Sequence, residues 1–221
     1  MLAFFVRAIR WDIAHAVSRV SQFNSKPTVG TVAALTVIAG YLRQTLDFRI
    51  GGVRSPGVDD HFSVFTDSDH HGDRNMTSKS QTGVIVLVNG IPCHWRSNKQ
   101  PVTADSPACA EIYALKECVR DSRVLLWVAE EMGVDISYPF VVFCDSKQAI
   151  SFQGDTCPRS KIRGSFDLRE DWVSEVRDQK TVQMCKVEGT RNLADLFTKC
   201  LPTYKFKALV KMINEFQDQI F

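Results

Sequence analysis

The sequence contains no CxxC pair of cysteines and no cysteine–histidine spacing typical of a zinc site. Its seven cysteines are odd in number and scattered, which argues against a disulfide framework of the kind found in small secreted domains. A short apolar run from Leu2 to Val6 is interrupted by Arg7, so it is too short for a signal peptide or a membrane span. We therefore expect an intracellular protein that has no membrane partner.

Neither an excess of one charge nor any internal repeat is present. The formal net charge is +2, which by itself says little about partners. Apolar residues make up 44% of the chain and charged residues 24%, which is ordinary for a globular protein. A chain of 221 residues can hold one domain of moderate size plus an appendage.

The first fifty residues differ in pattern from the rest. Apolar residues recur at helical spacing over residues 2–21 and again over residues 31–46. A connector rich in glycine, serine and proline follows at residues 51–57. We therefore predict a helical segment over residues 1–52 and a second domain over residues 53–221.

The second domain combines strands with helices. The predicted strands cover residues 61–67, 83–88, 91–95, 138–144 and 181–187. The predicted helices cover residues 108–132, 145–152, 166–178, 192–200 and 203–219. Asn89-Gly90 is a strong signal for a hairpin turn, and Ser106 or Asp105 can cap the long helix. This order predicts an α/β fold with a mixed sheet and helices on its faces.

Four acidic residues lie where a strand or helix begins or ends, namely Asp67, Glu111, Asp145 and Asp195. Asp145 directly follows a buried strand, and ligand sites gather at the carboxyl ends of parallel strands. Four converging carboxylates without a cation would repel one another, whereas divalent metal ions take such oxygen ligands. For each acid alone, a capping or solvent-exposed role is the alternative. Together they predict a metal-dependent nuclease.

Several short motifs occur together in one order. They are Phe65-Thr66-Asp67-Ser68-Asp69, Lys79-Ser80-Gln81-Thr82-Gly83, Ala110-Glu111-Ile112-Tyr113-Ala114-Leu115, Cys144-Asp145-Ser146, and Asn192-Leu193-Ala194-Asp195-Leu196-Phe197-Thr198-Lys199. With these motifs the chain resembles the C-terminal ribonuclease H domain of Pol polyproteins from copia-type LTR retrotransposons. Asp12-Ile13, Ser21-Gln22-Phe23 and Tyr41-Leu42 extend the resemblance upstream to the tail of that family's reverse transcriptase.

This resemblance implies a ribonuclease H-like fold, a mixed five-stranded sheet flanked by helices, and hydrolysis of the RNA strand in RNA–DNA hybrids. It implies two Mg²⁺ ions as cofactors, with Mn²⁺ as a substitute, held by Asp67, Glu111, Asp145 and Asp195. The implied partners are the hybrid and the reverse transcriptase domain of the same polyprotein. The implied location is the cytoplasm, a virus-like particle or the nucleus.

A ribonuclease H holds the backbone of a hybrid without reading its sequence, so basic residues are expected at phosphates. The candidates are Lys79, Arg96, Lys99, Arg159, Lys161 and Arg163. The alternative for each of them is ordinary surface charge.

Two other functions fit parts of the sequence. The family usually has a histidine where Ser165 stands here, and no histidine follows His94, so a catalytically impaired or domesticated relic is one alternative. A transposase or integrase core is the other, but it would need a glutamate about 35 residues after Asp145. Lys180 occupies that position, and the nearby Glu188 lies at the end of a predicted strand.

Overall fold

The structure is a computed structural model that describes residues 2–51, 61–70, 79–134, 136–147 and 181–215. Within these ranges, no helix is both long enough and apolar enough to cross a lipid bilayer. The predicted helix at 166–178, and all but the start of the one at 145–152, lie outside the described residues.

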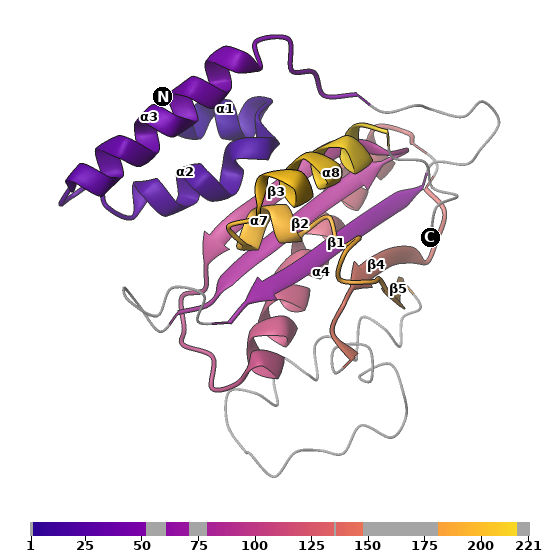
Figure 1. Cartoon of the computed structure of the whole chain (residues 1–221). Helices are drawn as coiled ribbons and strands as arrows, with labels where there is room; N and C mark the ends of the chain where they lie inside the picture. The colour runs from indigo at the N-terminus through magenta and orange to yellow at the C-terminus, as the bar shows by residue number, and fades with distance from the viewer. Residues whose placement is uncertain (1, 52–60, 71–78, 135, 148–180, 216–221) are drawn as a thin grey trace.

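Five strands form one mixed sheet in the order β3-β2-β1-β4-β5 (Figure 1). The strands are β1 Phe62–Asp69, β2 Gln81–Val88, β3 Ile91–Lys99, β4 Phe140–Cys144 and β5 Val182–Lys186. The first three strands pair antiparallel, whereas β1 with β4 and β4 with β5 pair parallel. The ribonuclease H-like fold class predicted from the sequence is confirmed by this arrangement.

The turn between β2 and β3 follows from its residues. Asn89 and Gly90 both have a positive φ, of 51° and 76°, which is the backbone of a two-residue turn that matches the twist of paired strands. Asparagine and glycine adopt this conformation more readily than other residues. The predicted hairpin is therefore confirmed.

One face of the sheet is covered by the long helix α4, Pro107–Glu131 (Figure 1). Ser106 is its N-cap, and the side chain accepts a hydrogen bond from the backbone N–H of Cys109 at 3.2 Å. The helix stops before Gly133, which has a φ of 74°. Between α4 and the sheet lies an apolar core that includes Val64, Leu115 and Val142.

The opposite face is covered by two shorter helices near the end of the chain, α7 Asp195–Thr198 and α8 Thr203–Asn214 (Figure 1). Phe65, Ile85 and Phe197 are fully buried in the core on this side. The sheet is thus the middle layer between α4 and the C-terminal helices.

The N-terminal segment forms four helical pieces beside the edge strand β3 (Figure 1). They are α1 Leu2–Ala8, the 3₁₀ turn η1 Trp11–Ile13, α2 Ala14–Ser21 and α3 Val29–Gln44. The helical spacing over residues 2–21 does not correspond to one uninterrupted helix, since the helix breaks around Arg10.

The break has a physical cause in the buried side chain of Arg10. Its guanidinium donates to both carboxylate oxygens of Asp12, at 2.9 and 2.8 Å, and to the hydroxyl of Thr45 at 2.7 Å. Tyr41 donates to the same carboxylate at 2.8 Å. These charge-assisted bonds join the 3₁₀ turn to the end of α3 and replace the helical path that the apolar spacing predicts.

The N-terminal segment shares a core with the sheet domain. Trp11 and Ala14 are buried in the same apolar cluster as Phe65 and Phe197. The indole of Trp95 on β3 donates to the backbone carbonyl of Val6 at 2.6 Å. The boundary predicted near residue 52 adjoins residues outside the description, and the division into two domains stays a prediction.

Candidate metal centre

Parallel pairing of β1 and β4 brings two of the four acids together at the carboxyl ends of these neighbouring strands. Phe65 pairs in register with Phe143, and their rings stack with centroids 4.8 Å apart. Asp67 and Asp145 each follow these residues by two positions, so they extend from equivalent places on neighbouring strands. Asp195 opens helix α7 on the covering layer. One carboxylate oxygen from each of the three aspartates lies within 4.8 Å of the others.

The fourth acid, Glu111, lies in the first turns of α4 and is not one of these three. It is nevertheless close enough to interact electrostatically with Asp67 and Asp145. Burial, and then the charges of these two aspartates, raise the pKa of Glu111 to about 9. Burial likewise raises the pKa of Asp67 to about 6, against the effect of a nearby lysine. The acids are therefore held together at a cost that a bound cation would relieve.

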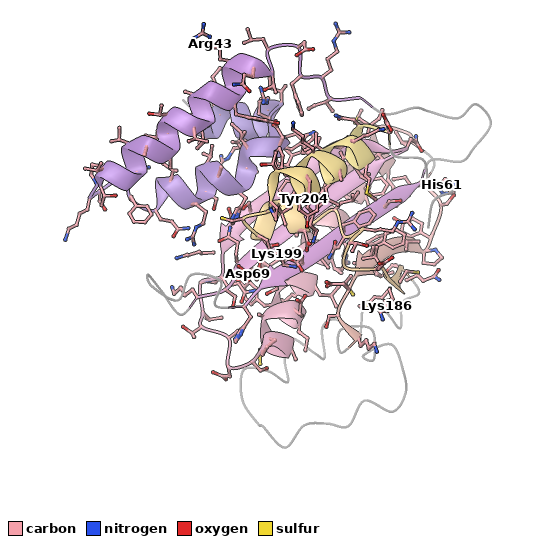
Figure 2. The ribbon with its side chains drawn as sticks, viewed as in Figure 1. Arg43, His61, Asp69, Lys186, Lys199 and Tyr204 are labelled. Atoms are coloured by element: carbon pink, nitrogen blue, oxygen red, sulfur yellow. The ribbon has the colours of Figure 1, made fainter. Side chains whose placement is uncertain are left out.

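Two lysines partly neutralise the negative charge of these acids. Nζ of Lys199 lies 2.6 Å from Asp195 and 3.2 Å from Asp67, and Nζ of Lys205 lies 2.6 Å from the other oxygen of Asp195. The hydroxyl of Thr198 also donates to Asp67. Although burial opposes the charged form, the two aspartates raise the pKa of Lys199. Figure 2 shows Lys199 beside Asp69 at this end of the sheet.

Helix α7, and with it Asp195, is held in place by residues that are not among the four acids. Buried Asn192 donates to the carbonyl of Thr66 on β1 at 3.1 Å and accepts from the N–H of Ala194 at 3.1 Å. Gly83 on β2 allows the close approach of the helix, since a Cβ there would lie 2.8 Å from the carbonyl oxygen of Ala194. The motif strings contained these residues, but sequence reasoning assigned them no role.

The sequence analysis also did not predict the ion pairs of Lys199 and Lys205 with Asp195, although the sequence contained a signal for the first of them. Lys199 follows Asp195 by four positions, a spacing that places two side chains together on a helix. Lys205 gave no comparable signal, because its contact depends on how α8 packs.

The predicted phosphate contacts fall in different places. Lys79 is exposed, and Lys99 is partly buried at the end of β3. Arg96 forms ion pairs at 2.6 Å with Glu117 and at 2.9 Å with Asp121 on α4. Arg159, Lys161 and Arg163 lie outside the described residues.

The donor set suits a hard divalent cation. Mg²⁺ takes carboxylate oxygens and keeps several waters, and this group presents oxygens alone at the three closest positions. The two lysines contact Asp67 and Asp195, and Glu111 and Asp145 add two further acidic groups, so the acids of this group outnumber its lysines. Asp67, Asp145 and Asp195, with Glu111 beside them, are the residues that would hold such ions.

The strand order and the acids gathered at the carboxyl ends of β1 and β4 define a ribonuclease H-like domain. The sequence comparisons give the particular family: the homologues of this chain, over most of its length, are copia-type Pol polyproteins. The resemblance that the sequence motifs indicate is therefore confirmed.

The "Retrovirus-related Pol polyprotein from transposon TNT 1-94" of Nicotiana tabacum is 30% identical over 214 residues, 96% of this chain. The corresponding polyprotein from transposon RE2 of Arabidopsis thaliana is 26% identical over 93% of the chain. The chain spans only 16% and 14% of the lengths of these relatives. No protein-family model matches it.

Among solved structures, LC11-RNase H1 aligns with a TM-score of 0.47 and 15% identity, over 62% of this chain and 92% of that one. A structure of the foamy viral protease-reverse transcriptase in complex with dsDNA aligns with a TM-score of 0.43 and 15% identity, over 64% and 92% of the two chains.

Proposed function

We propose that this chain hydrolyses the RNA strand of RNA–DNA hybrids during retrotransposon reverse transcription, with two Mg²⁺ ions bound at Asp67, Glu111, Asp145 and Asp195. The observation that carries the proposal is the convergence of Asp67, Asp145 and Asp195 within 4.8 Å. The Pol relatives support the setting, because their names describe retrovirus-related polyproteins. By the same reasoning, the reverse transcriptase domain of such a polyprotein is the proposed partner.

Asp67 has the central part in this proposal. It interacts electrostatically with Glu111, Asp145 and Asp195, and we therefore assign it to both metal ions. The bound ions would supply an activated water and stabilise the leaving 3′ oxygen. The lysines at Asp67 and Asp195 must give up part of their contact when the ions bind.

The substrate surface is proposed from the basic residues around the acids. Lys79 and Lys99 are the described candidates for contacts to backbone phosphates, and Arg159, Lys161 and Arg163 remain candidates from the sequence. Arg96 is a weaker candidate, since both sides of its guanidinium are already engaged by carboxylates. Contacts of this kind fix the position of a duplex without reading its bases.

The test is a cleavage assay on the purified chain. A hybrid labelled on the RNA strand, a hybrid labelled on the DNA strand and a duplex DNA are each incubated with Mg²⁺ or Mn²⁺. Cleavage of the RNA strand alone, with loss of activity in EDTA, is the expected result. An intact hybrid at high protein concentration with both metals would refute the proposal.

A second candidate, a relic that keeps the fold and binds nucleic acid without cleaving it, is favoured by one structural observation. Lys199 and Lys205 together engage both oxygens of Asp195, which can hold the site together without metal. Ser165, where the family usually has a histidine, agrees with this reading. Hybrid binding without cleavage in either metal would support it.

A further inference from the structure

The outer face of helix α4 changes character along its length. Over residues 108–119 no side chain is exposed, whereas exposed side chains recur from residue 120 to the C-cap of the helix. Four of these exposed side chains are large and apolar, with exposed fractions between 46 and 75%: Val124, Trp127, Val128 and Met132. Their spacing places them together on one side of the helix, and we call them the α4 stripe.

The α4 stripe is a second apolar face on a helix that already has one. Leu115, Val119 and Leu126 are buried in the core between α4 and the sheet. A helix that covers a sheet normally has polar residues on its outer side. Single exposed apolar residues are common, but a contiguous group that includes tryptophan and methionine is typical of protein–protein interfaces. The stripe is therefore a candidate contact surface for another protein chain.

The charges beside the stripe indicate which partner it fits. Arg123 and Glu131 are both exposed, and they lie four positions before and four positions after Trp127. When two α4 helices cross antiparallel at Trp127, residues equally far before and after this position face one another. Arg123 of one copy then faces Glu131 of the other copy, and two-fold symmetry repeats the pair. A parallel crossing would instead bring like charges together.

The neighbouring charged residues already have partners within the chain. Arg120 contacts Glu117 at 2.5 Å, and Glu130 accepts a hydrogen bond from the hydroxyl of Tyr138, also at 2.5 Å. These contacts hold the charges next to the stripe without involving Glu131. The apolar stripe and the opposite charges on either side of Trp127 thus make this face complementary to itself.

We propose that the α4 stripe binds a second copy of this chain, in a two-fold symmetric dimer whose α4 helices cross antiparallel at Trp127. Trp127 lies about 24 Å along the helix axis from Glu111, so the contact leaves the metal centre of each copy open. The dimer therefore goes beyond the proposed activity and does not depend on it.

The first test measures self-association of the full chain by sedimentation equilibrium in EDTA. A stable interface usually buries about 800 Å² on each partner, and one helix face offers less, so we expect a dissociation constant of about 10–100 µM. The average mass should rise with concentration from 24.9 kDa towards twice that value. Trp127→Ser removes the central side chain and should weaken the association by at least about tenfold.

The second test exchanges the members of the charge pair. Arg123→Glu and Glu131→Arg should each weaken the dimer about tenfold, because like charges then face each other at both ends of the contact. The double variant should recover the affinity of the original chain, since it restores opposite charges. A double variant that associates as weakly as the single variants would overturn the antiparallel arrangement.

The matched control is Val37→Ser, which changes an exposed apolar residue on helix α3 of the N-terminal segment. This variant should dimerise like the original chain. At low concentration the melting temperatures of all these variants should equal that of the original, because the replaced side chains are exposed. A chain that stays monomeric throughout would overturn the proposal, as would association lost in Val37→Ser but kept in Trp127→Ser. None of these measurements depends on hybrid cleavage.

Discussion

Two clusters of charged side chains, one between β3 and α4 and the other at the carboxyl ends of β1 and β4, differ in how completely their charges are paired. On the α4 side, Arg96 and Arg120 contact Glu117 at 2.6 and 2.5 Å, and Arg96 and His94 contact Asp121 at 2.9 and 3.2 Å. Each carboxylate there has at least two donors. This network joins β3 to α4.

At the carboxyl ends of β1 and β4 the balance is different. Lys199 contacts Asp67 and Asp195, and Lys205 contacts Asp195. Glu111 and Asp145 add two further acidic groups to this cluster, and the pKa of Glu111 is raised to about 9. Buried charges that are fully paired hold elements together, whereas buried acids in excess require a further cation or proton. The contrast distinguishes a structural cluster from a candidate reactive one within a single sheet.

The largest expected difference is in activity. Asp67→Asn removes a proposed metal ligand and should lower the proposed hybrid cleavage about 10³-fold, equivalent to ~4 kcal/mol of lost transition-state stabilisation. Glu117→Gln removes one acid from the paired cluster and should leave the cleavage rate unchanged. Single-turnover rates of both variants at saturating Mg²⁺ check this, and equal losses would remove the distinction between the clusters.

The pH dependence of stability should expose the excess acids. The folded pKa of Asp67, about 6, and that of Glu111, about 9, lie above the usual values of 3.8 and 4.5. The stability they contribute is full below the usual values and is lost as the pH rises through 6 and then 9. Urea midpoints of the metal-free protein should fall from pH 5 to pH 9. Glu111→Gln should flatten this decline, and added Mg²⁺ should reduce it.

Removing a donor from the paired cluster should cost stability alone. Arg96→Gln leaves Glu117 and Asp121 with fewer partners, and we expect a loss of ~1–3 kcal/mol in the free energy of unfolding. Urea denaturation measures it. A reduced salt slope in hybrid binding with unchanged stability would instead identify Arg96 as a phosphate contact.

The smallest effect concerns the lysine that pairs with two acids. Lys199→Gln should lower the free energy of unfolding of the metal-free protein by ~1 kcal/mol, which lowers its melting temperature. Because the lysine no longer competes for the acids, the stabilisation gained on adding Mg²⁺ should increase. The matched control is Lys211→Gln, since Lys211 is an exposed residue of α8 that lies 3.8 Å from Glu215, four residues further along the chain. An equal response of both variants to Mg²⁺ would show that Lys199 does not compete with the metal.

Much of the sheet could be predicted from local patterns, because strand ends and turns have specific residue requirements. Asn89-Gly90 marks its turn through positive φ angles, and a buried strand before Asp145 places this acid at a sheet edge. The ion pair between Lys205 and Asp195 and the helix break at Arg10 could not be predicted in this way. Both depend on partners that only tertiary packing brings near, on α8 and at the end of α3 respectively.

The close approach at Gly83 bears on how related transposon copies should be read. Any side chain at this position would collide with Thr198, Ala194 and Phe197, at 2.6 to 2.9 Å, and push the α7 turn outward. A copy can therefore keep all four acidic residues in its sequence and still lose the geometry that brings them together. In a survey of decayed elements, a non-glycine residue here would flag inactivation that a search for intact catalytic motifs overlooks.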